Sequence, residues 1–122
     1  MQQGKIEGHA GFARRVAAWS QTHDVDLTDV PFYKSNSAVI VNDEASATEL
    51  HQELQRMANA VGKPKLIVLD TLARTMIGDE NSSERVGEYI KALDDVKAEY
   101  GCTILIVHHT GHSSNSRARG SS

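Results

Sequence analysis

The residues with the clearest chemical potential are an aspartate and two histidines that follow apolar runs. The run from Leu66 to Asp70 ends in a carboxylate, and the run from Thr103 to His108 ends in an imidazole that is followed by His109. Four apolar residues and then Asp form the Walker B arrangement, in which the carboxylate holds Mg²⁺ beside a triphosphate. A strand that ends in Asp also commonly opens a turn, so the pattern alone leaves both interpretations open.

The histidines allow two further interpretations. With His112, His108 and His109 spell H-H-x-x-H, which suggests a transition-metal site. Zinc-binding pairs usually lie at i and i+4 on a helix, whereas this segment leaves a strand for a glycine-containing loop with no cysteine or acidic ligand close by. The metal interpretation is therefore less favoured. The plainest alternative is that His108 caps the strand end by hydrogen bonding to the backbone.

Three charged residues near the ends of the chain have two interpretations each. A general base that polarises water would have to reach the γ-phosphate from a neighbouring strand, and Glu7 is a candidate for it. Seen locally, Glu7 is an ordinary acid near a terminus. Arg117 and Arg119 look like a basic tail, although arginines also compensate transition-state charge across a subunit boundary. The surrounding sequence does not decide between these roles.

The elements that must position these residues follow from the apolar pattern. Continuous apolar runs at 65–70 and 103–108 predict strands buried on both faces, which is typical of a parallel sheet. Between them an amphipathic helix is predicted over about residues 82–100. Strand, long helix and strand form a βαβ unit with parallel strands. Because ligands collect at the carboxyl ends of such strands, Asp70 and His108 are expected at one rim of the sheet.

Outside this unit the sequence predicts two more helices and little regular structure. Apolar residues at helical spacing predict a helix at about residues 9–22, and cap-type side chains at 42–48 precede another that ends before Gly62. Residues 71–81 read as a loop or short turn. Two short segments are weak candidates for extended structure, 32–34 and 38–41.

Length, charge and composition limit the remaining possibilities. The 122 residues suit one domain, and the net charge of −3 argues against a chain whose whole surface binds nucleic acid. The single cysteine, Cys102, cannot form an intramolecular disulfide. No apolar run approaches the ~20 residues of a membrane span, and the N-terminus lacks a signal-peptide pattern. We therefore expect a soluble cytoplasmic protein with no membrane partner.

Several blocks of the sequence together resemble one family. Leu66–Arg74, Gly78–Ser82, Leu105–His112 and Arg117–Ser122 resemble the plasmid RepA-type hexameric helicases and the related ATPases of phages and mobile elements. Glu7–Trp19 looks like that family's second-strand glutamate and the helix after it. The resemblance covers nearly the whole chain. It implies a partial RecA-like core, a three-layer α/β fold whose mostly parallel sheet has flanking helices.

The resemblance also implies domain limits, site residues, cofactors and partners. Residues 1–112 would form the truncated RecA-like ATPase domain, and 113–122 a flexible polar and basic tail. By the resemblance, Glu7 matches the water-activating glutamate, Asp70 the Walker B aspartate that binds Mg²⁺, and His108 and His109 the sensor positions that read the γ-phosphate. The residues that it places against ATP are Asp70, Thr71, Arg117 and Arg119. Single-stranded DNA is the partner that it implies. Because the predicted sheet lacks neighbouring strands, its exposed edges also predict a homo-oligomer formed by strand pairing or swapping.

The sequence departs from this family at the phosphate-binding loop. No G-x-x-x-x-G-K-[ST] motif occurs, because the Gly-Lys pairs at 4–5 and 62–63 lack the earlier glycine and the following Ser or Thr. Losing even ~4 kcal/mol of phosphate contacts lowers affinity about a thousandfold. We therefore expect a fragment or shortened relative of a replication helicase, without autonomous ATPase activity. The alternatives are a non-catalytic binding or oligomerisation module, which docks onto a full-length relative, and a small metal-dependent hydrolase.

Overall fold

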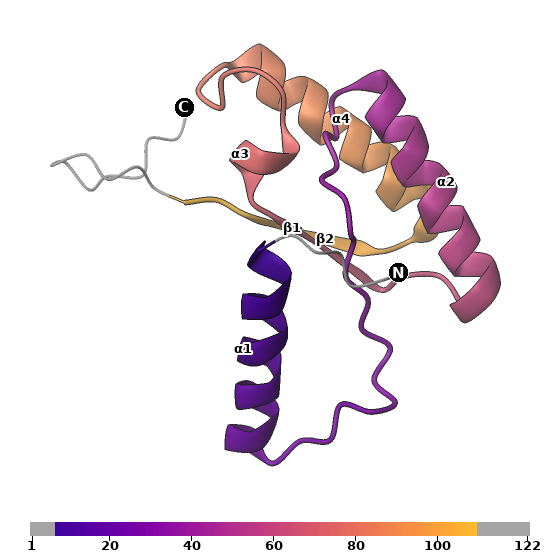
Figure 1. Ribbon diagram of the computed structural model, residues 1–122. Coiled ribbons are helices and arrows are strands. Elements are labelled where there is room, and N and C mark those ends of the chain that lie inside the picture. Colours follow the sequence, from indigo (N-terminus) through magenta and orange to yellow (C-terminus); the bar gives the residue numbers. More distant parts are fainter. Residues whose placement is uncertain (1–6, 110–122) are drawn as a thin grey trace, which may run out of the picture. The chain divides into compact units, whose positions relative to one another are not determined.

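The structure is a computed structural model that describes residues 7–109, and it has the α/β class that the sequence predicts. The chain forms two compact units that divide between Ala38 and Val39, and each is described by itself. Figure 1 shows the elements in chain order. They are α1 (Glu7–His23), α2 (Glu44–Val61), β1 (Leu66–Asp70), α3 (Leu72–Thr75), α4 (Ser83–Tyr100) and β2 (Thr103–Val107).

The first unit contains α1 and the irregular segment that follows it. The helix predicted at 9–22 is confirmed, with ends that differ by one or two residues. The rings of Phe12 and Phe32 stack with their centroids 6.0 Å apart, which ties the irregular segment back to the helix. The segment 32–34, a weak candidate for extended structure, does not form a strand. The Phe12–Phe32 contact, and not strand pairing, therefore holds this part of the segment against α1.

The second unit is built around two parallel strands. β1 and β2 pair directly, with Leu66 beside Thr103 at one end and Asp70 beside Val107 at the other. Helix α4 connects them, as the βαβ pattern predicts (Figure 1). The parallel direction follows from this long crossover, because a tight hairpin would make neighbouring strands antiparallel. The predicted strand–helix–strand unit is confirmed.

Helix α4 starts and stops where the sequence signals predict. The Ser82 side chain accepts a hydrogen bond from the backbone N–H of Arg85 at 3.3 Å. At the other end Gly101 has φ of 62°, and its N–H donates to the carbonyl oxygen of Lys97 at 2.8 Å. Glycine adopts this left-handed conformation without steric strain, so it ends the helix cleanly and turns the chain into β2.

Helix α2 has similar boundary signals. The Asp43 carboxylate accepts a hydrogen bond from the N–H of Ser46 at 3.0 Å, and Gly62 follows the last helical residue with φ of 103°. These caps satisfy backbone groups that a helix end leaves unpaired. Within residues 7–109 no helix combines the length and apolar character needed to cross a membrane.

The core lies between one face of the two strands and helices α2 and α4. Ile67 and Ile104 contact both of the buried clusters that make up this core, so the strands join them. One cluster consists of Val41, Leu69, Leu72, Met76, Tyr89 and Leu93. The other consists of Leu54, Val96, Tyr100 and Cys102.

The opposite face of the strands differs from the prediction of burial on both faces. Leu66, Val68 and Leu105 remain 55%, 51% and 53% exposed. Alternate strand residues point to opposite faces, and the strand residues that pack into the core are their neighbours Ile67, Leu69, Ile104 and Ile106. A continuous apolar run does not distinguish a strand covered on both faces from one covered on a single face. In the second unit, α2 and α4 supply the cover on one face.

The segment after β1 holds a short helix that the sequence did not reveal. Residues 71–81 were predicted as a loop or short turn, and α3 forms there because Leu72 and Met76 bury their side chains in the core. Val41, in the candidate extended segment 38–41, donates its N–H to the carbonyl oxygen of Thr75 at 2.7 Å. This backbone bond does not make 38–41 a strand.

Candidate functional site

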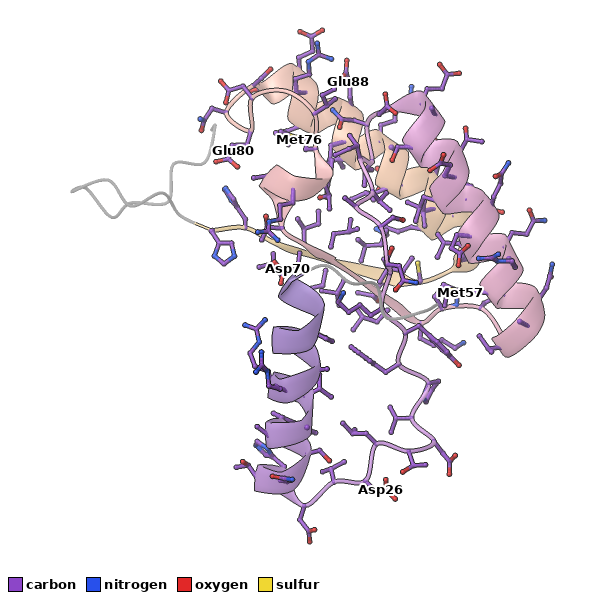
Figure 2. The ribbon with its side chains drawn as sticks, in the orientation of Figure 1. Asp26, Met57, Asp70, Met76, Glu80 and Glu88 are labelled. Carbon is purple, nitrogen blue, oxygen red and sulfur yellow. The ribbon has the colours of Figure 1, made fainter. Side chains whose placement is uncertain are left out.

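The candidate site lies at the carboxyl ends of the two strands. Asp70 is the last residue of β1 and is paired with Val107, and His108 follows Val107 directly. Figure 2 shows Asp70 at the end of its strand. The prediction that Asp70 and His108 share one rim of a parallel sheet is therefore confirmed, because the strand register sets both at the same end.

The Asp70 carboxylate is available to a ligand. Asp70 is exposed, and within the described part of the chain its side chain makes no hydrogen bond or ion pair. The peptide bond that follows it, between Asp70 and Thr71, is cis. Thr71 is half-buried at the N-cap position of α3, and its side chain makes no capping hydrogen bond. A carboxylate that has no side-chain partner among residues 7–109 can coordinate a cation without first breaking an interaction with them.

Glu80 is a rim residue that sequence reasoning missed. Its carboxylate oxygen Oε2 lies 3.8 Å from Nε2 of His108, and both side chains are partly exposed. Figure 2 shows Glu80 in the loop between α3 and α4. The separation exceeds hydrogen-bonding distance, so a protonated His108 would form a surface ion pair with it. The acid-rich block Gly78–Ser82 was visible in the sequence, but only the fold brings it to the end of β2.

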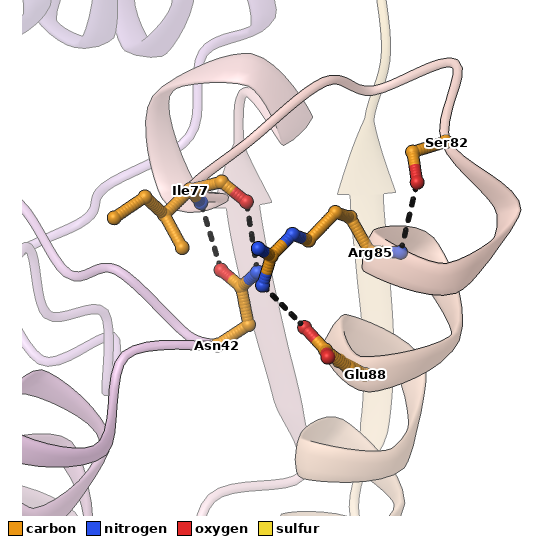
Figure 3. Close-up of polar contacts among 5 residues, drawn as sticks. All are labelled: Asn42, Ile77, Ser82, Arg85 and Glu88. Atoms are coloured by element: carbon orange, nitrogen blue, oxygen red, sulfur yellow. Dashed lines mark hydrogen bonds and ion pairs between the residues drawn. The ribbon is translucent and has the colours of Figure 1, made fainter.

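The loop that carries Glu80 is fastened to the segment before α2. The Asn42 side chain donates from Nδ2 to the carbonyl oxygen of Ile77 at 2.9 Å and accepts from the N–H of Ile77 at 2.8 Å. Figure 3 shows this two-bond contact. The amide side chain therefore pairs with both the backbone N–H and the backbone carbonyl of one residue, as a neighbouring strand would. We call this contact the Asn42 latch.

A second contact constrains the same loop beyond the latch. Gly78 has φ of 95°, and a Cβ atom there would lie 3.0 Å from Cγ of Arg85, so the arginine stem lies against the glycine. The guanidinium of Arg85 reaches Glu88 at 3.1 Å on the next turn of α4 (Figure 3). Glycine at this position allows both the left-handed backbone and the close approach.

Beneath the rim, a buried hydroxyl contact links α3 to α4. The Thr75 hydroxyl lies 2.7 Å from the Tyr89 hydroxyl and donates to the carbonyl oxygen of Thr71 at 2.8 Å. Tyr89 has no exposed surface. Burial raises the pKa of Tyr89, and the hydrogen bond with Thr75 acts in the opposite direction. The phenol therefore stays neutral and able to donate.

The remaining predicted site residues are not joined to the rim by the described structure. Glu7 is the first residue of α1 in the first unit, so its role as water-activating base stays a prediction. His109 is exposed and directly follows His108. Three predicted residues lie outside the described range, and their roles also stay predictions. They are His112, Arg117 and Arg119.

The donor groups at the rim suit Mg²⁺ better than a transition metal. Across residues 7–109 no group of three or more His, Cys, Asp or Glu side chains is arranged to hold a metal ion. Mg²⁺ usually keeps several waters and takes only one or two carboxylates together with phosphate oxygens. Asp70 fits that requirement. Zinc sites take three or four protein ligands, and the described residues do not assemble such a set.

Comparison with known proteins agrees with this geometry. Residues 4–115, which are most of the chain, match a protein family described as AAA domain, one of the AAA-type P-loop ATPases. The match spans both strand ends and the loop between α3 and α4. No solved structure matches the chain.

Proposed function

Because the chain belongs to the AAA domain family, we propose that it supplies the acid-and-histidine part of a RecA-like ATPase of the plasmid RepA helicase type. In this proposal Asp70 is the Walker B acid, His108 and His109 are sensors, and the protein acts in replication of a plasmid, phage or mobile element. The observation that carries it is the strand register, in which Asp70 lies beside Val107 and therefore next to His108.

The roles of the rim residues follow from their chemistry. Mg²⁺ would neutralise charge on the β- and γ-phosphates when bound. Asp70 would hold the ion through its exposed carboxylate, directly or through water. His108 would donate a hydrogen bond toward the γ-phosphate, and the Glu80 carboxylate lies 3.8 Å from its Nε2. The Asn42 latch would keep Glu80 in reach of His108 through the loop that it fastens.

We also propose that the chain does not hydrolyse ATP on its own. The printed sequence has no Walker A motif, whose backbone amides and lysine supply most contacts to a triphosphate. Asp70 and the histidines offer few contacts by comparison. We therefore propose that ATP hydrolysis requires a phosphate-binding loop in addition to these 122 residues. Single-stranded DNA is the proposed partner of the completed assembly.

Phosphate release with Mg²⁺, ATP and single-stranded DNA tests this proposal. The chain alone should release phosphate no faster than its Asp70→Asn variant. Asp95→Asn is the matched control, because Asp95 is an exposed acid on α4 away from the strand ends. Steady turnover that Asp70→Asn abolishes and Asp95→Asn leaves intact would show that the chain is a complete ATPase and would overturn the proposed division of the site.

A second candidate function is a non-catalytic docking or oligomerisation module. The half-exposed Leu66, Val68 and Leu105 on one face of the strands favour it, because adjacent exposed apolar side chains often mark an interaction surface. We propose a second copy of the chain, or a full-length relative, as the partner. Static light scattering should detect self-association that Leu105→Lys reduces. Ile90→Lys, on exposed α4 surface, should leave it unchanged, and a monomeric wild type would refute this candidate.

A further inference from the structure

We infer that Tyr89 is a positioning residue for Asp70, acting through Thr75 on the carbonyl of Thr71, the residue after the acid. This inference rests on the proposed role of Asp70 in cation binding. Tyr89 lies on α4 with no exposed surface, and Thr75 ends α3 with 8% exposure. Their hydroxyl oxygens are 2.7 Å apart, and the Thr75 hydroxyl lies 2.8 Å from the carbonyl oxygen of Thr71. Thr71 is the residue directly after Asp70.

Either hydroxyl can be the donor between Tyr89 and Thr75. We assign the Thr75 hydroxyl proton to the Thr71 carbonyl, which can only accept and lies at 2.8 Å, closer than the Leu72 carbonyl at 3.3 Å. In this assignment the Tyr89 hydroxyl donates to Thr75. Each buried hydroxyl is satisfied in this arrangement, and a donor chain that ends on a carbonyl strengthens both bonds. We call the series Tyr89, Thr75 and Thr71 the hydroxyl relay.

The relay matters because α3 is too short to be stable as a helix without tertiary contacts. It has four residues, and an isolated helix of one turn is unstable in water. The Thr71 carbonyl accepts the N–H groups of Arg74 and Thr75, each at 3.1 Å, so it is the start of this turn. The relay fixes that carbonyl to α4, a helix of 18 residues in the core. The orientation of the neighbouring Asp70 thereby depends on a hydroxyl in the core.

The alternative is that Tyr89 only fills space in the core. Its ring belongs to the buried cluster with Leu69, Leu72 and Leu93, and a phenylalanine would fill the same space. Tyr100 provides the matched comparison within this protein. It is also a buried tyrosine of α4, but among the described residues its hydroxyl makes no hydrogen bond to α3. Removing the two hydroxyls separately therefore distinguishes a relay from packing.

The test uses Mn²⁺ as a paramagnetic substitute for Mg²⁺ on the isotope-labelled, unfused chain. Titration should broaden the amide signals of Asp70 and Thr71, and Asp70→Asn should abolish that broadening. Tyr89→Phe and Thr75→Val should each raise the Mn²⁺ dissociation constant about fivefold, since each removes a hydrogen bond of the relay. Thr75→Ser keeps the hydroxyl and should stay within about twofold of wild type, as should Tyr100→Phe.

The carbonyl ¹³C shift of Thr71 is recorded in the same samples without metal. It should move in Tyr89→Phe and Thr75→Val and stay in place in Thr75→Ser and Tyr100→Phe. If the wild type shows no broadening that depends on Asp70, the unfused chain does not bind the cation, and the inference that Tyr89 positions Asp70 for cation binding is refuted. If the wild type binds Mn²⁺ and Tyr89→Phe matches it in both readouts, the inference is refuted while the proposed function stands.

Discussion

Removing the Asn42 latch should destabilise the second unit by about 1–2 kcal/mol. The change is Asn42→Ala, which deletes the bonds of 2.9 Å and 2.8 Å to the two backbone groups of Ile77. A neutral hydrogen bond contributes about 0.5–1.5 kcal/mol net. Ile77 is 52% exposed, so water can reach its freed N–H and carbonyl groups, and the total stays below the maximum of about 3 kcal/mol for two bonds.

Urea unfolding followed by far-ultraviolet circular dichroism measures this effect. Asn42→Asp keeps the acceptor for the N–H of Ile77 but loses the donor to its carbonyl, so its loss of stability should be at least half that of Asn42→Ala. Thr48→Ala is the control, because it removes a hydroxyl that bonds within α2 to the carbonyl of Glu44. It should change the free energy of unfolding by less than about 0.5 kcal/mol.

Amide hydrogen exchange adds a local readout. The N–H of Ile77 should exchange about tenfold faster in Asn42→Ala, since its acceptor is gone. If Asn42→Ala unfolds within about 0.3 kcal/mol of wild type, with the same denaturant slope and the same exchange at Ile77, the latch carries no stability. The account of how the loop is held would then be wrong.

Two further predictions concern backbone conformation and pH. Gly101→Ala should destabilise the protein by about 1–2 kcal/mol, because alanine is strained at the φ of 62° even though nothing crowds the added Cβ. Gly87→Ala, in the middle of α4, should instead stabilise it by about 0.5–1 kcal/mol. Urea unfolding measures both changes, and changes of the same sign would refute the left-handed conformation assigned to Gly101. Burial raises the pKa of Tyr89 and of Tyr100 above the ordinary 10.0, so their neutral forms favour folding; this contribution is complete below pH 10 and is lost as the pH rises through the folded-state values. Unfolding curves measured above pH 10 should show that loss, smaller in Tyr89→Phe and Tyr100→Phe, and identical alkaline curves for all three proteins would contradict it.

Much of the rim was predictable from the sequence because it depends on local patterns. Two apolar runs that end in Asp70 and His108, with one helix between them, allow only a parallel pair with both ends at one edge. Gly101 and Ser82 marked the helix ends for equally local reasons, a left-handed residue and a capping hydroxyl.

The rest depended on contacts between segments far apart in the chain. Glu80 reaches His108 only after the loop folds over the strand ends, and Asn42 bonds Ile77 across 35 residues. Helix α3 was missed because its four residues carry no periodic signal, and tertiary burial of Leu72 stabilises it. The exposed Val68 was missed because an apolar run does not state how many helices will cover the sheet.

A double-mutant cycle on a completed ATPase tests the shared rim most directly. The strand, phosphate-binding loop and following segment of another AAA domain family member would be fused ahead of residue 4, the start of the family match. In that fusion Asp70→Asn should lower kcat about a hundredfold or more, and His108→Ala should also lower it. If both side chains act on one phosphate group, the double variant should stay within about threefold of the worse single variant. A double variant whose loss of kcat equals the product of the two single losses would contradict the claim that these strand ends form one nucleotide site. A fusion that hydrolyses ATP and loses no activity in either single variant would contradict it as well.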